Sequence, residues 1–170
     1  MDGQFLADAE PLADAALRQR LDDLQTDYAH AIDDGDLEAW PGFFAEDGRY
    51  KIVSRENHEA GLPIGVLYCD SRGMMSDRVL ALRTANIFEP HTYCHLISRS
   101  RYAQGGDGLI RGRTNFQVVR AMQDGQTDLF AVGKYLDLID PAASGARPLF
   151  RDRLVVLESR RIDVLLCYPL

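Results

Sequence analysis

The chain has 170 residues, of which 46% are hydrophobic, and it carries a formal net charge of −7. A chain of this length can bury about two thirds of its unfolded surface, so we expect one globular domain over residues 1–170, with residues 1–10 as a flexible arm. The acidic balance argues against a nucleic-acid or anionic-membrane partner, since both need a basic surface. No apolar run approaches the roughly 20 residues of a membrane span, and the start lacks the order of a signal peptide, so we expect a cytoplasmic protein.

The first third of the chain is typical of helices. Leu17, Leu21, Leu24, Tyr28 and Ile32 recur at intervals of three or four residues, which predicts a helix over residues 11–35 with one buried face. Two further helices are expected: a short one that Asp36 caps and that carries Leu37, Trp40, Phe43 and Phe44, and a longer one over residues 71–86 with Met75, Val79 and Leu82 facing inward.

From residue 49 onward the pattern becomes extended, apart from the helix expected over residues 71–86. A first strand is expected at residues 49–53, followed by a loop over residues 54–63 and an apolar run over residues 64–68. After Pro90 the alternating pattern predicts a strand of about ten residues. Asp124-Gly125 predicts an antiparallel hairpin. The hairpin strands and the last two strands are predicted at residues 109–122, 127–139, 150–159 and 162–168.

This order of elements indicates an α+β fold. Helices first and long antiparallel strands last favour one strongly curved, mixed but mainly antiparallel sheet wrapped around the N-terminal helices. That is the cone fold, also called nuclear transport factor 2-like or cystatin-like, which ketosteroid isomerases and scytalone dehydratase share. The fold alone implies no activity.

The most unusual segment is residues 70–95, which concentrate ionisable side chains in about one helix and one strand. Its polar members are Asp70, Ser71, Arg72, Asp77, Arg78, Arg83, His91 and His95. A plain core element needs fewer charges than this. We therefore expect either a functional site or an interface here.

A metal site is disfavoured at these histidines. On a strand, His91 and His95 would lie roughly 13 Å apart, too far for one mononuclear site. The three cysteines, Cys69, Cys94 and Cys167, are widely spaced and fit reduced thiols, and Cys94-His95 lacks the second cysteine-histidine pair of a Rieske centre. Hydrogen bonding to a carboxylate or a backbone carbonyl is the expected role of both imidazoles.

General acid–base chemistry stays open as an alternative. The interior of a cone could bring Asp34, Asp47, Tyr28, His91 or His95 together and shift their pKa values by burial. This alternative is a stand-alone isomerase or dehydratase that uses Asp47, Tyr28 or His95 as its acid or base. A second alternative is a module that binds a small ligand in the cone.

Many positions resemble the small, or beta, subunits of aromatic-ring-hydroxylating dioxygenases, which are Rieske non-haem iron oxygenases. The resemblance covers nearly the whole chain, and its most specific part is the block at residues 70–95. Outside the block it is carried by Tyr28, Ala31, Asp33, residues 40–44, 47–50, 56–57, 61–62 and 133–137, and Pro169-Leu170.

The resemblance implies a structural subunit with no catalytic residue and no cofactor of its own. It implies a homotrimer of this chain that supports three large (alpha) subunits in an α3β3 assembly. The Rieske 2Fe-2S cluster and the mononuclear iron then lie in the large subunit, with electrons supplied by NADH through a reductase. The expected substrate is an aromatic carboxylate, with terephthalate first and salicylate, anthranilate or a halobenzoate as further candidates.

The same resemblance gives the charged block an assembly role. Arg72, Arg78 and Arg83 can form bidentate pairs with carboxylates such as Asp70 and Asp77, within the subunit or across a boundary. We therefore expect the polar members of the block, with His91 and His95, to determine the shape of the subunit or its contacts.

Overall fold

The computed structural model describes residues 5–6, 9–85, 88–142, 147–159, 166 and 168–170. It is an α+β fold, with its helices in the first half of the chain. The helices are α2 (Ala15–Asp33), the 3-10 helix η1 (Trp40–Phe43), α3 (Arg55–Glu59) and α4 (Arg72–Thr84). The strands are β1 (Glu10–Pro11), β2 (Phe44–Ser54), β3 (Leu67–Cys69), β4 (His91–Ile97), β5 (Arg101–Gln104), β6 (Ile110–Met122), β7 (Thr127–Asp140) and β8 (Leu149–Leu157).

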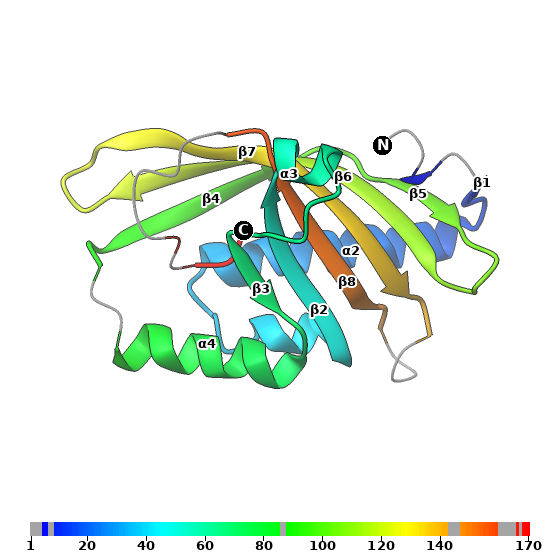
Figure 1. The fold of residues 1–170 in the computed structure, drawn as a ribbon, viewed down its shortest axis with the longest axis horizontal. Helices are drawn as coiled ribbons and strands as arrows, with labels where there is room; N and C mark the ends of the chain where they lie inside the picture. The colour runs from blue at the N-terminus through cyan, green and yellow to red at the C-terminus, as the bar shows by residue number, and fades with distance from the viewer. Residues whose placement is uncertain (1–4, 7–8, 86–87, 143–146, 160–165, 167) are drawn as a thin grey trace.

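All the strands belong to one curved, mixed sheet. Its order is β1-β5-β6-β7-β8-β2-β3, and β4 pairs with β6 beyond the end of β5. Among the described strands, only β2 and β8 run parallel, and the other pairs are antiparallel. Figure 1 shows α2 along one face of the sheet and α4 beside β2 and β3. The predicted cone fold is therefore confirmed.

Helix α2 follows the predicted apolar stripe. The Asp14 carboxylate caps it by accepting hydrogen bonds from the backbone amides of Ala16 and Leu17 at 2.9 and 3.0 Å. The helix begins at Ala15 rather than near Pro11, because Glu10 and Pro11 pair with β5 as an edge strand, a position that tolerates proline. At the other end Gly35 takes a positive φ of 75°.

Two expectations for the segments around β2 are wrong. Asp36 does not cap a regular second helix, because the segment forms only the four-residue 3-10 helix η1, whose start has no side-chain cap and contains Pro41. The expected loop at residues 54–63 contains α3, which Ser54 caps through the backbone amide of Asn57. Helix α3 has no buried residue, so its sequence lacks the apolar period that would predict a helix.

The strands also differ from the prediction in length. Strand β2 is longer than expected and carries an irregularity between Phe44 and Arg49. Gly48 is needed there, since a Cβ atom at this position would lie 2.8 Å from the carbonyl oxygen of Ala45. The strand expected after Pro90 divides into β4 and β5.

The predicted hairpin is confirmed. Strands β6 and β7 pair antiparallel along most of their lengths, and Gly125 in the turn has a φ of 88°. The strand predicted at residues 150–159 is confirmed as β8, with slightly different ends. The last strand, predicted at residues 162–168, falls mainly outside the described residues.

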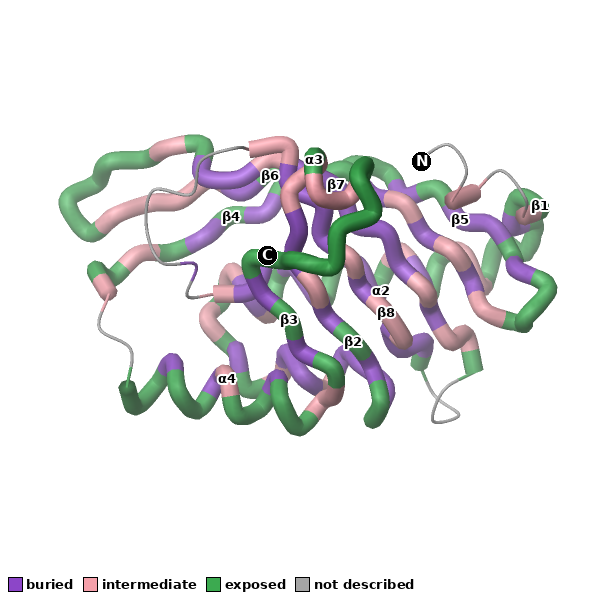
Figure 2. The backbone as a smooth tube through the Cα atoms, viewed as in Figure 1, coloured by how far each residue is buried: buried purple, intermediate pink, exposed green. Residues whose placement is uncertain are grey.

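The interior of the cone is filled by aromatic side chains. Figure 2 shows buried backbone along the central strands and on α2. Phe116 stacks on Tyr135 with ring centroids 4.4 Å apart, in space that Gly133 leaves free opposite Phe116. Tyr28 and Tyr50 both hydrogen-bond the backbone of Leu170, at 2.9 to 3.1 Å. The C-terminal residue is therefore part of the core.

The described N-terminal residues contact the sheet. Phe5 packs on a small apolar cluster of Val53, Leu136 and Val156, and Glu10 pairs with Gln104. Within the described parts of the chain, every helix is too short or too polar to cross a membrane.

Candidate functional site

Helix α4 brings most of the charged block together at one end of the sheet. Ser71 is its N-cap and accepts a hydrogen bond from the backbone amide of Met74 at 3.3 Å. The Ser71 hydroxyl also donates to the Asp70 carboxylate at 3.2 Å. As predicted, Met75, Val79 and Leu82 form the buried stripe of the helix. The arginines consequently lie at the margins of the helix, where they can reach neighbouring segments.

Arg72 joins the start of α4 to the irregular part of β2. Its guanidinium donates two hydrogen bonds to the backbone carbonyl of Phe44, one of them from Nε at 3.1 Å. Glu46, which is 91% exposed, lies 3.4 Å from the same guanidinium. Phe44 is the residue at which the β2–β8 register shifts. Arg72 therefore hydrogen-bonds a carbonyl at the point where the strand is irregular.

The other two arginines of α4 join it to two further segments. Arg78 donates to the backbone carbonyl of Leu166 at 2.9 Å. Arg83 binds both carboxylate oxygens of Glu38 at 2.8 and 2.9 Å and also the carbonyl of Gly35 at 2.8 Å. The hydrogen bonds from Arg83 lower the pKa of Glu38 to about 2.

Within the described part of this chain, these arginines do not pair with the expected partners Asp70 and Asp77, and pairing across a subunit boundary stays a prediction. In the described part of the chain, Arg72 and Arg83 pair with glutamates of other elements, and Arg78 binds a backbone carbonyl. Asp77 is exposed on α4. Sequence proximity misleads here because α4 packs against β2 and η1, which bring carboxylates from about 26 to 45 residues away.

His95 is held by a single carboxylate of α2. Asp33 lies 2.6 Å from the Nδ1 atom of His95 through one oxygen and accepts the backbone amide of His95 at 2.8 Å through the other. The imidazole is fully buried, and its Nε2 atom has no hydrogen-bond partner among the described residues. Asp33 thereby fastens the last residue of α2 to strand β4.

His91 belongs to an aromatic cluster instead. Its Nδ1 atom lies 2.8 Å from the backbone carbonyl oxygen of Glu89. Its ring packs against Tyr93, Tyr168 and Phe88, with centroids 5.0 to 5.6 Å apart. The two histidines therefore bond to a carbonyl and a carboxylate, the two kinds of partner named from the sequence.

The described donor atoms of this chain do not fit a Rieske cluster or a mononuclear iron. His91 and His95 lie on one strand, four residues apart, and Asp33 occupies Nδ1 of His95. Cys69 and Cys94 are both free thiols, the first buried and the second exposed. Within the described residues, no group of three or more potential ligands is placed to hold a metal ion.

The residues of the acid–base alternative do not meet. The Tyr28 hydroxyl is buried, where it donates to Leu170 and accepts from Trp40 at 3.2 Å, and burial raises its pKa. The Asp47 side chain is 73% exposed and pairs with Arg151. His95 is bonded to Asp33 at the end of α2. Each group already has a structural partner, and Asp34 serves as the C-cap of α2.

One polar cluster inside the cone was not anticipated. Arg153 and Asp137 are fully buried, directly opposite on β8 and β7, and form two hydrogen bonds of 2.9 Å. Gln25 of α2 donates to Asp137 at 2.7 Å and accepts from Arg153. The guanidinium carbon lies 3.9 to 4.2 Å from the ring centroids of three surrounding aromatic residues, Tyr28, Tyr135 and Phe150.

The contacts in this cluster keep Arg153 positively charged. Burial opposes the positive charge of Arg153, but Asp137 outweighs that effect, and the pKa of the guanidinium is raised. A sequence signal for it existed. Asp137 shares the alternation of Tyr135 and Ile139, which places a charge at an inward position of a predicted strand.

Comparison with known proteins relates the whole arrangement to one family. Residues 27–164 match the family described as "Ring hydroxylating beta subunit". The chain is 37% identical to the anthranilate 1,2-dioxygenase small subunit of Burkholderia cepacia over 147 residues, which are 86% of this chain and 90% of the relative. It is 36% identical to subunit beta 1 of the terminal oxygenase component of terephthalate 1,2-dioxygenase from Comamonas sp, over 84% of this chain and 92% of that one.

Solved structures agree. A chain assigned as the beta subunit of an aromatic-ring-hydroxylating dioxygenase from Novosphingobium aromaticivorans superposes with a TM-score of 0.81 at 36% identity, covering 90% of this chain and 96% of that one. A chain of naphthalene 1,2-dioxygenase shares the fold, with a TM-score of 0.78 at 20% identity over 99% and 93% of the two chains. The chain belongs to the family of ring-hydroxylating dioxygenase beta subunits.

Proposed function

We propose that this chain is the structural beta subunit of a multicomponent dioxygenase that hydroxylates an aromatic carboxylate. The observation that carries the proposal is the similarity, over more than four fifths of the chain, to small subunits of anthranilate and terephthalate dioxygenases. The filled cone interior supports a structural role, since Tyr28, Tyr50 and Tyr135 are buried in it.

The proposed partner is a large oxygenase subunit that carries the Rieske cluster and the mononuclear iron. The residues of this chain support that division, because its histidines and described cysteines do not form a set of iron ligands. We propose a homotrimer of this chain beneath three large subunits, in an α3β3 assembly in the cytoplasm, with electrons from NADH.

The substrate class rests on the relatives. The identities with the anthranilate and terephthalate subunits are 36 to 37%, so this chain is equally similar to both. We place terephthalate first and keep anthranilate, salicylate and halobenzoates in the class. Within such an assembly the iron pocket of the large subunit would select among them.

The test is co-expression with a large oxygenase subunit from the same organism that carries the paired cysteine-histidine motifs of a Rieske cluster. We expect the two chains to purify together, the complex to contain iron and show the electron paramagnetic resonance signal of a reduced Rieske cluster, and the complex to oxidise an aromatic carboxylate when a reductase and NADH are supplied. This chain expressed alone should purify without stoichiometric iron and without oxygenase activity.

Naphthalene, which has no carboxylate, serves as the control substrate. Turnover of naphthalene and of none of the carboxylates would contradict the substrate class. Stoichiometric iron in this chain alone, or turnover of a substrate by this chain alone, would contradict the structural role.

A further inference from the structure

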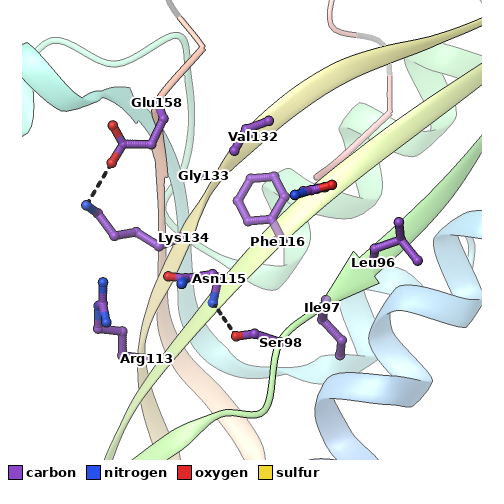
Figure 3. Close-up of a pocket in the computed structure, with 11 residues that line it drawn as sticks. Leu96, Ile97, Ser98, Arg113, Asn115, Phe116, Val132, Gly133, Lys134 and Glu158 are labelled. Atoms are coloured by element: carbon purple, nitrogen blue, oxygen red, sulfur yellow. Dashed lines mark hydrogen bonds and ion pairs between the residues drawn. The ribbon is translucent and has the colours of Figure 1, made fainter.

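A groove lies on the outer face of the sheet, on the side opposite the aromatic core. It has a volume of about 590 Å³ and lies over β4, β6 and β7. Its side chains include Leu96, Arg113, Asn115, Gln117, Val132 and Lys134. They face outward because the residues that alternate with them on β6, such as Thr114 and Phe116, are buried. We call this the outer-face groove (Figure 3).

Most cations on this face have a carboxylate partner. Lys134 pairs with Glu158 at 2.9 Å, as Figure 3 shows, and Arg111 pairs with Asp107 at 3.2 Å. Arg49, further along the sheet, pairs with Asp152 at 2.7 Å. Because these cations are paired, an arginine without a carboxylate partner on the same face is an exception.

Arg113 has no such partner. Its Nε atom is buried without a hydrogen-bond acceptor, and no residue in the described ranges forms an ion pair with its guanidinium. Arg101 lies directly opposite on β5 and is exposed, with no carboxylate partner among the described residues either. Like charges directly opposite on neighbouring strands destabilise a sheet. The sheet therefore carries an uncompensated positive charge at this place.

The groove also has an apolar component. Leu96 is 55% exposed at its margin, and Val132 lies across from it beyond Gln117. Arginine beside exposed apolar side chains is the composition of subunit interfaces rather than of ordinary solvated surface. An occupant must supply carboxylates for Arg113 and Arg101 and an apolar group for Leu96.

We propose that the outer-face groove docks carboxylate side chains of a second copy of this chain, an inference that rests on the self-assembly in the proposed function. The net charge of −7 means that every copy brings carboxylates in excess. Exposed acidic residues of α2 and the turn after it, such as Asp27 and Asp34, have no ion pair within the described part of the chain. A groove that meets a different surface of the next copy generates a closed ring when the rotation fits.

The experiment uses the full chain expressed alone and measures its self-association by sedimentation velocity over a range of concentrations. The variant is Arg113→Glu. The matched control is Arg99→Glu, because Arg99 is exposed and is not among the residues that line the groove, and the charge change is the same. Thermal unfolding of both variants monitors the fold.

We expect Arg113→Glu to weaken self-association roughly tenfold or more, because it places a carboxylate where the incoming carboxylate binds. Arg99→Glu should change self-association less than about threefold, because a single exposed surface charge contributes little free energy. Raising the salt from about 0.05 M to about 0.5 M should weaken the wild-type assembly and have less effect on Arg113→Glu. At a concentration where both proteins are monomeric, the melting temperature of Arg113→Glu should not fall below that of wild type, since the new carboxylate would face Arg101.

Equal self-association of Arg113→Glu and Arg99→Glu would overturn the inference and leave the proposed function intact, since co-purification with the large subunit tests the latter separately. If Arg113→Glu still self-associates but no longer binds the large subunit, the groove belongs to that subunit and the inference is wrong. A wild-type chain that is monomeric at every concentration would overturn both the inference and the proposed homotrimer.

Discussion

Arginine has different partners in two regions of this subunit. Inside the cone, Arg153 is fully buried and its main partner is the equally buried carboxylate of Asp137. On α4, at the surface, Arg78 donates to a backbone carbonyl and forms no ion pair with a described residue, and Arg83 binds Glu38 with both side chains about half exposed. The interior arginine thus compensates charge, whereas the α4 arginines connect segments of the chain.

The difference follows from desolvation. A buried guanidinium loses its water and needs an opposite charge and further hydrogen bonds, which Asp137 and Gln25 provide. At the surface, water still competes for each ion pair, so the free energy gained is small. Loss of one partner should therefore destabilise the fold strongly in the interior and weakly on α4.

The largest effect is expected for Arg153→Met. The variant leaves the Asp137 carboxylate buried and unpaired, so the free energy of unfolding should fall by about 3 to 5 kcal/mol. The matched control is Arg151→Met on the same strand. The Arg151 side chain is 41% exposed and pairs with Asp47, which is 73% exposed, and more distantly with Asp140. Urea denaturation followed by circular dichroism measures both.

A double variant keeps this prediction testable if Arg153→Met does not fold. Replacing both charges, as Arg153→Met with Asp137→Leu, removes the unpaired carboxylate and should recover at least about 1 kcal/mol relative to the single variant. A single variant as stable as Arg151→Met would show that the pair does not contribute as argued.

An intermediate effect is expected for Arg78→Met. Arg78 is partly buried and donates to the carbonyl of Leu166, a buried residue. Loss of the donor leaves that carbonyl without this hydrogen bond, so the free energy of unfolding should fall by about 1 to 2 kcal/mol. Arg78→Lys, which retains a donor, should lose less. Equal losses in the two variants would assign the effect to packing of the arginine stem.

A smaller effect is expected for Arg83→Met. The ion pair with Glu38 is bidentate, but the side chains of Arg83 and Glu38 are 44% and 60% exposed. The free energy of unfolding should fall by about 0.5 to 1 kcal/mol, and the difference from wild type should shrink at high salt. A loss as large as that of Arg153→Met would contradict the distinction between the two regions.

The sequence predicts these regions unequally, for physical reasons. The stripes of α2 and α4 and the Asp124-Gly125 hairpin are local patterns, and they predicted the elements well. The partners of the α4 arginines could not be predicted, because Phe44, Leu166 and Glu38 reach the helix only through the tertiary packing. Helix α3 buries no residue, so its sequence has no apolar period from which a helix could be predicted.

The smallest expected effect is on how the free energy of unfolding changes at low pH. The hydrogen bonds from Arg83 lower the pKa of Glu38 from its ordinary 4.5 to about 2 in the folded protein. A carboxylate with a lowered pKa stabilises the fold above its unfolded pKa and loses that contribution as the pH falls from about 4.5 toward 2. In Glu38→Gln this loss is absent, so the free energy of unfolding should decrease less steeply across that window than in wild type.

Because Glu38 is 60% exposed, solvent reduces the stabilisation, and the two stability curves should differ only slightly. Other carboxylates also titrate in this window, so the difference between wild type and Glu38→Gln is the quantity to measure, by urea denaturation at several pH values. Arg83→Met should show the same difference, since it removes the cause of the lowered pKa. Curves with equal slopes would mean that the ion pair at the surface does not survive in solution, which would widen the contrast with the pair of Arg153 and Asp137.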